Sequence, residues 1–171
     1  MSTENEVNEA SNNEEVIESS YEINAWEDLE LPIDLLRGIY SYGFEKPSVI
    51  QQKAIKPIMM GRDIIAQAQS GTGKTATFSI GALSMVDLKE NNTQVLVLSP
   101  TRELTTQTAK VMSSIGSMMD GLRVQTLFGG SSVEEHSSFL KKSSPHIICG
   151  CPGRVYAVSY THLTLPTKRI V

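Results

Sequence analysis

Apolar and polar residues follow two different rhythms along the middle of the chain. Short apolar runs, typical of buried strands, are separated by longer stretches in which apolar residues recur every three or four positions, as on one face of a helix. Strands are expected at 64–68, 95–99, 124–128 and 147–150, and helices at 74–87, 102–118 and 133–141. Strands that alternate with helices favour right-handed crossovers and a parallel sheet. The expected fold class is α/β, with helices covering both faces of the sheet.

Two further helices are expected ahead of the first strand. One runs through 35–40, and Ser48 can cap another that begins at Val49. Order should begin near Trp26, because residues 1–22 are rich in Glu, Asn and Ser and hold few large apolar groups. That composition predicts a disordered acidic tail, with an acidic interaction arm as the alternative.

Charge and length narrow the class of protein only slightly. At 171 residues the chain can form one domain. The net charge of −4 comes from the tail, since residues 23–171 hold 15 basic and 12 acidic groups. A mildly basic body can bind polyanions, but this charge alone does not indicate nucleic acid. Cys149 and Cys151 are too close together for an ordinary disulfide and are expected to be reduced. No membrane span or secretory leader is recognisable, which favours an intracellular protein.

A glycine-rich turn lies between the first expected strand and its helix. Its residues are Ala68, Gln69, Ser70, Gly71, Thr72, Gly73, Lys74 and Thr75. Glycines let consecutive N–H groups face one anion, and the positive end of the next helix adds its dipole. Lys74 is expected to reach the β/γ-phosphates of a nucleotide, and Thr75 to offer its hydroxyl to Mg²⁺. A mere glycine-rich connector would leave the placement of Lys74 and Thr75 at a helix start unexplained.

Five motifs, in this order and spacing, resemble the first RecA-like domain of a DEAD-box RNA helicase. They are the segment 43–51, the turn at 68–75, Pro100-Thr101-Arg102-Glu103-Leu104, Gly129-Gly130, and Cys151-Pro152-Gly153-Arg154. The stretch 35–52 is especially similar to the eukaryotic translation initiation factor 4A subfamily. The resemblance implies a partial RecA-like P-loop domain over 23–157 that includes the family's Q motif.

The same resemblance implies roles for individual residues. Gln51 is the implied adenine reader, because one carboxamide satisfies both the N6 donor and the N7 acceptor of the base. Phe44 would stack on adenine, with core burial as its alternative. The implied RNA contacts are Pro100, Thr101, Arg102, Gly129, Gly130, Pro152, Gly153 and Arg154. Loop N–H groups and arginines suit phosphate oxygens, so binding should be independent of RNA sequence and steeply dependent on salt. The alternative for Arg102 and Arg154 is a solvated arginine at a helix start.

The family's acidic Asp-Glu-Ala-Asp motif is absent from this chain. That motif supplies the carboxylate that holds the metal and the group that orients the attacking water, and nothing after Glu135 is acidic. ATP hydrolysis by this chain alone is therefore expected to be negligible. We expect a fragment of a longer helicase, truncated before the strand that carries the acidic motif. Residues 158–171 resemble a translated cloning or sequencing linker and are expected to be non-native.

The leading hypothesis is an ATP-dependent RNA helicase that uses ATP and Mg²⁺. Its complete form would remodel messenger RNA in the cytoplasm, or alternatively in the nucleus, with translation-initiation scaffold proteins as partners and no membrane contact. Two alternatives stay open. One is a module that binds nucleotide or RNA without turnover, and the other is a small P-loop phosphotransferase. Because the missing strand would leave apolar faces uncovered, we also expect poor solubility or partial unfolding.

Overall fold

The computed structural model describes residues 23–130, 132–162 and 169–170 of the chain. The acidic tail predicted at 1–22 lies outside the described residues. In chain order the elements are η1 (Trp26–Leu29), α2 (Ile33–Ser41), α3 (Val49–Met59), α4 (Lys74–Ser84), β1 (Val95–Leu98), α5 (Arg102–Ile115), η2 (Gly116–Met118), β2 (Val124–Leu127), α6 (Val133–Ser143), β3 (Ile147–Gly150), α7 (Pro152–His162) and β4 (Arg169–Ile170). Among these described elements, no helix is both long and apolar enough to cross a membrane.

The strands form one parallel sheet in the order β2-β3-β1-β4. Strand β3 lies between β1 and β2, with Ile147 opposite Val95 on one side and Val124 on the other. Strands β1, β2 and β3 therefore end at the same edge of the sheet, and the loop after each of them starts there. The parallel α/β sheet predicted from the sequence is confirmed.

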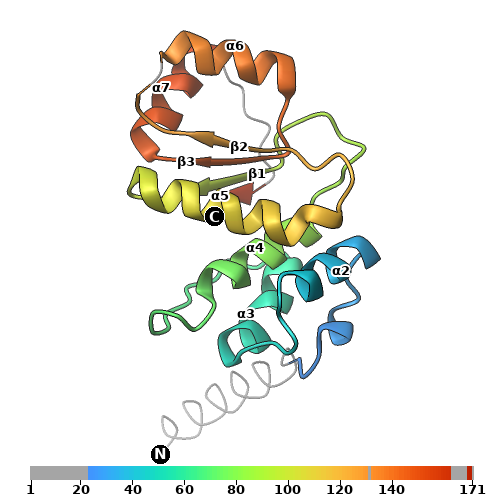
Figure 1. Ribbon diagram of the computed structural model, residues 1–171. Helices are drawn as coiled ribbons and strands as arrows, with labels where there is room; N and C mark the ends of the chain where they lie inside the picture. The colour runs from blue at the N-terminus through green and yellow to red at the C-terminus, as the bar shows by residue number, and fades with distance from the viewer. Residues whose placement is uncertain (1–22, 131, 163–168, 171) are drawn as a thin grey trace, which may run out of the picture.

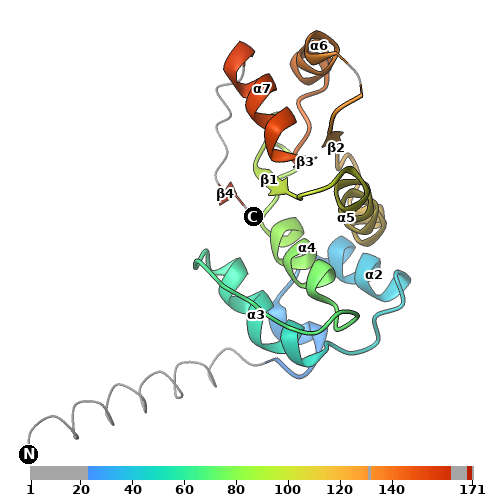
Figure 2. The same cartoon turned by 90° about the vertical axis from the view of Figure 1, so that its left-hand side faces the viewer.

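Helices cover both faces of this sheet. Helices α6 and α7 lie on one face, and α5 lies on the other, with α2, α3 and α4 beyond it (Figures 1 and 2). The alternation of side chains along β1 explains the two layers, because successive residues of a strand point to opposite faces. Val95 and Val97 belong to the larger hydrophobic cluster, and Leu96 belongs to the smaller one. Coverage of both faces was also predicted correctly.

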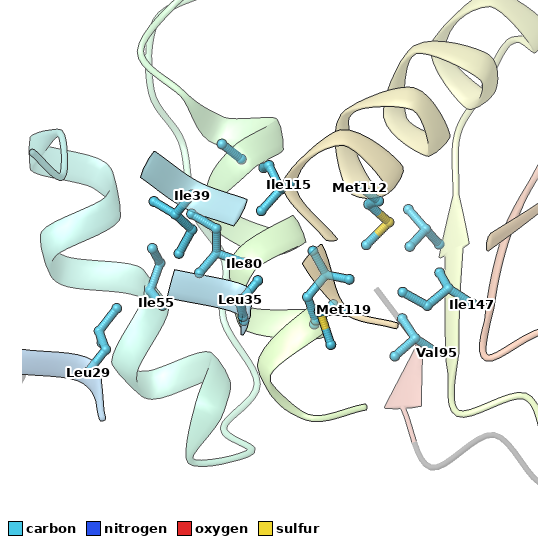
Figure 3. Packing of buried hydrophobic residues seen from close by; sticks show 14 of the residues in the cluster. Leu29, Leu35, Ile39, Ile55, Ile80, Val95, Met112, Ile115, Met119 and Ile147 are labelled. Carbon is cyan, nitrogen blue, oxygen red and sulfur yellow. The ribbon is translucent and has the colours of Figure 1, made fainter. Parts of the chain in front are cut away.

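The larger cluster joins the sheet to the layer of N-terminal helices (Figure 3). Leu35, Ile80, Met112 and Ile115 are fully buried in it, and each such side chain contributes about 1.5–3 kcal/mol relative to exposure. Helix α2 approaches very closely here. A Cβ added to Gly38 would lie only 1.9 Å from the carbonyl oxygen of Ile115, so this contact requires glycine.

The strand predicted at 64–68 is not formed. This segment has no regular secondary structure, and the side chain of Ile65 is fully exposed. An apolar run forms a strand only where a neighbouring strand accepts its backbone hydrogen bonds. Within the described residues β1 is flanked by β3 and β4 on its two sides, and no strand there pairs with 64–68. The glycine-rich turn is therefore preceded by irregular chain rather than by a strand.

The other elements lie where the pattern predicts them, with shifted ends. Helix α4 stops at Ser84, and η2 completes the stretch predicted as the end of one helix at 118. Helix α7 was not predicted, and it continues across the proposed boundary between residues 157 and 158. Val158 is fully buried with Val155 in the smaller cluster. The described chain therefore has no break at residue 158, and the non-native origin of 158–171 stays a prediction.

Candidate functional site

The first turn of α3 holds the glycine-rich loop from one side. Ser48 Oγ donates a hydrogen bond to the carbonyl of Thr72 (2.9 Å), and Gln51 Oε1 accepts one from the Ser48 N–H (2.7 Å). Gln51 is only 2% exposed. Its Nε2 lies so close to Gly73 that a Cβ there would be 2.7 Å away. The predicted adenine reader thus lies between the cap of α3 and the loop, with one lone pair of its carbonyl already in use.

The loop itself folds around the side chain of Lys74. Lys74 Nζ donates to the carbonyl oxygens of Ala68 and Gln69, and Thr72 Oγ1 donates to the Gln69 carbonyl (2.8 Å). Gly71 and Gly73 have φ values of +82° and +95°, a region that side chains with a Cβ rarely adopt. The turn therefore requires both glycines, and it places the lysine ammonium against the backbone of the loop.

Helix α4 starts directly from this loop at Lys74. Its cap is Gly73, which brings no side chain, and its first turn contains no acidic residue. The first N–H groups of α4 therefore keep their partial positive charge without compensation from a carboxylate. Thr75 lies half-buried in the same turn, and Gln69 and Ser70 are exposed. A lysine, an uncapped helix start and an open loop together fit a polyanion such as a nucleotide phosphate chain.

Phe44 belongs to a group of three aromatic rings beside α3. Trp26 is fully buried, and its Nε1 donates to the carbonyl of Phe44 (3.0 Å). The Phe44 ring centroid lies 6.3 Å from that of Trp26 and 4.9 Å from that of Tyr42. Phe44 is half-buried and packs against the larger cluster, so its core role is observed and its role in base stacking stays a prediction. Tyr42 was not predicted as a member of this aromatic group, although its position two residues before Phe44 was a usable signal.

The other three motif loops meet at the carboxyl edge of the sheet, where each leads into a helix start. Thr101 caps α5 by accepting the Leu104 N–H (3.3 Å), and Ser132 caps α6 by accepting the Glu135 N–H (3.0 Å). Most of the predicted RNA contacts are exposed there, namely Pro100, Thr101, Arg102, Gly129, Gly130, Pro152 and Gly153. The edge therefore brings together the N-terminal ends of α5, α6 and α7, of which the first turns of α5 and α6 also contain Glu103, Glu134 and Glu135.

Arg102 lies between the loops that follow β1 and β2. Its guanidinium carbon is 4.6 Å from the centroid of the Phe128 ring. A Cβ on Gly130 would approach Arg102 Nη1 to 3.6 Å. One turn later, Thr105 Oγ1 lies 3.4 Å from Cys151 Sγ, at the end of β3. The first turn of α5 thus brings all three predicted loops together. Phe128 was not predicted to contact Arg102. Its position just before the glycine pair was the only indication in the sequence.

Arg154 is placed differently from Arg102. Its Nη1 is buried and has no hydrogen-bond partner among the described residues. Burial lowers the pKa of His136 on α6, and the charge of Arg154 lowers that pKa further, while Glu135 partly opposes the shift. Arg154 therefore lies beside α6, partly covered, and is not a fully solvated helix-start arginine.

The two cysteines stand as free thiols, as predicted. Cys149 is fully buried, and burial raises the pKa of its thiol to about 12. Among the described residues no three His, Cys, Asp or Glu side chains gather into a group that could hold a metal ion. The proposed Mg²⁺ contact therefore depends on the Thr75 hydroxyl and on nucleotide phosphates.

Known proteins are similar to this chain in sequence and in architecture. Residues 48–169 match the family described as DEAD/DEAH box helicase. The chain is 49% identical over 142 residues to the ATP-dependent RNA helicase eIF4A of Chaetomium globosum, covering 82% of this chain and 35% of that protein. Prp28 from Chaetomium thermophilum bound to ADP is similar in structure, with a TM-score of 0.74 at 31% identity over 87% of this chain and 38% of that one.

A second solved structure resembles the chain equally in its fold. S. cerevisiae Dbp5 bound to RNA and ADP BeF3 has a TM-score of 0.70 at 34% identity, covering 81% of this chain and 34% of that one. The chain thus spans about a third of the length of the relatives it matches.

Proposed function

Because the chain belongs to the DEAD/DEAH box helicase family, we propose that it binds ATP at the glycine-rich loop and RNA at the carboxyl edge of the sheet. The proposal of ATP binding rests on the loop at 68–73. This loop places Lys74 at the uncapped start of α4, and Ser48 connects the loop to α3 by a hydrogen bond. Both binding surfaces use backbone N–H groups and cations, the donors that phosphate oxygens require.

In this proposal Lys74 exchanges the carbonyl oxygens of Ala68 and Gln69 for phosphate oxygens. The N–H groups of the first turn of α4 bind the same phosphates, and the Thr75 hydroxyl faces the Mg²⁺ that accompanies ATP. When bound, Mg²⁺ neutralises charge on the phosphates. Gln51 and Phe44 receive the adenine base. The short distance between Gln51 Nε2 and Gly73 supports one continuous site for base and phosphates.

The proposed RNA surface is the edge formed by the loops after β1, β2 and β3. Arg102, the exposed glycines at 129–130 and the start of α7 would contact the sugar–phosphate backbone without reading bases. The solved Dbp5 structure, which contains RNA, supports an RNA surface on this fold. Affinity should therefore fall steeply with salt and vary little with RNA sequence.

For the complete protein we propose RNA-dependent ATP hydrolysis and RNA unwinding. The 49% identity to a relative named as an ATP-dependent RNA helicase eIF4A supports this activity. A cytoplasmic location and initiation scaffold proteins as partners belong to the same proposal. For the chain as given, the better candidate is a module that binds without turnover. No acidic residue follows Glu135, and a metal-holding carboxylate is needed for phosphoryl transfer to water.

Nucleotide titration of the purified chain tests the proposal. Replacing Lys74 by Ala should weaken ATP binding roughly tenfold to hundredfold, because charge-assisted hydrogen bonds are lost. Lys110→Ala, which removes an exposed lysine from α5, is the matched control and should bind ATP as the original chain does. If the Lys74→Ala variant and the original chain bound ATP with equal affinity, the loop would not be the phosphate site.

A further inference from the structure

Phe128 is an aromatic residue without a core role. It is half-buried, yet it belongs to neither of the two hydrophobic clusters, although Leu127 before it is fully buried in the smaller one. Its ring instead lies beneath the guanidinium of Arg102, at 4.6 Å from the centroid. Arginine is attracted to the face of an aromatic ring, both by its charge and by stacking.

This contact joins two loops whose strands are not neighbours. Arg102 begins α5 after β1 and Phe128 directly follows β2, while β3 lies between these two strands. The Arg102–Phe128 pair therefore spans the carboxyl end of β3, where Thr105 also contacts Cys151. Gly130 also lies near Arg102, because a Cβ built on it would be 3.6 Å from Arg102 Nη1.

Arg102 keeps N–H donors of its guanidinium available for a ligand. Within residues 23–130, 132–162 and 169–170, the ion pair that the structure contains joins Arg37 to Asp34, and no carboxylate pairs with Arg102. The contact with the ring pairs no guanidinium N–H group with a carboxylate, and these donors can bind one phosphate with two hydrogen bonds. A ring that fixes the side chain before binding reduces the entropy that must be lost on binding.

We propose that Phe128 is a positioning residue for RNA binding, which holds Arg102 across the end of β3 with its donors directed at a backbone phosphate. The inference rests on the proposed RNA-binding function and adds to it a residue outside all five motifs. Phe128 acts through Arg102 and needs no contact with RNA itself.

A double-mutant cycle on RNA affinity tests this role. Phe128→Leu should weaken binding of a single-stranded RNA about two- to fivefold, the effect of losing an exposed cation–π contact. Phe128→Tyr, which keeps the ring, should bind as the original chain does. In an Arg102→Ala background, Phe128→Leu should have no further effect. Phe139→Leu, at an exposed position on α6, is the matched control.

The dependence of affinity on salt gives a readout that a purely structural role would not change. Phe128→Leu removes no charge, but it should lower the slope of log affinity against log salt toward the slope of Arg102→Ala. Unchanged slope and affinity in Phe128→Leu, or equal effects of this change with and without Arg102, would overturn the inference while leaving RNA binding intact. If the original chain bound no RNA, the proposed function would fail and the inference with it.

Discussion

Gln51 has one neighbour that the sequence indicates, Ser48 of the capping box, and one that it does not reveal, Gly73. Its carbonyl oxygen caps α3 through Ser48, and its amide nitrogen lies against Gly73 in the phosphate loop. If Gln51 binds the base as we propose, a movement of its carboxamide would also disturb Gly73. The proposal therefore connects base recognition and phosphate binding through one buried residue.

Replacing Gln51 by Glu should lower ATP affinity about tenfold, because the carboxylate keeps the acceptor for Ser48 but loses the donor that adenine N7 needs. Pyrophosphate lacks the base, so its affinity should change much less. Titration of both ligands against Gln51→Glu and the neighbouring Gln52→Ala measures this difference. Equal losses for ATP and pyrophosphate would show that Gln51 does not read the base.

At the scale of elements, the docking of α2 depends on one glycine. Gly38→Ala places a methyl group against the carbonyl oxygen of Ile115, and forcing the helices apart should cost about 1–3 kcal/mol of unfolding free energy. Gly153→Ala in α7 is the matched control, since its Cβ would meet nothing within 4 Å. Urea denaturation of both variants gives the comparison. A Gly38→Ala chain as stable as the original would mean that α2 does not pack as described.

Most helices and three strands could be predicted from periodicity, because each of them has packing partners within this chain. The segment 64–68 could not, since its apolar run gives no information on whether a partner strand is present. Helix α7 was missed for a different reason. Pro152 and Gly153 read as a loop, whereas proline suits the first position of a helix. At the site, the glycine loop could be predicted, but the Arg102–Phe128 contact depends on how β1 and β2 are placed on either side of β3.

The whole molecule combines a well-packed interior with apolar groups on its surface. Ile65 is fully exposed and Leu98, at the end of β1, is 39% exposed. Among the described residues, Arg169 and Ile170 of β4 pair with Val95 and Leu96 of β1, and no described residue pairs with Leu98 on that side. Exposed apolar strand edges favour association between chains. These positions agree with the expected poor solubility, which stays a prediction.

We propose above all that this chain binds ATP and RNA but does not hydrolyse ATP. The most direct test is the steady-state release of phosphate by the purified chain, with and without RNA, at ATP concentrations where binding is measured in the same preparation. We expect saturable binding of ATP and no release of phosphate above background in either condition. RNA-stimulated release of phosphate that Lys74→Ala abolishes would contradict this proposal.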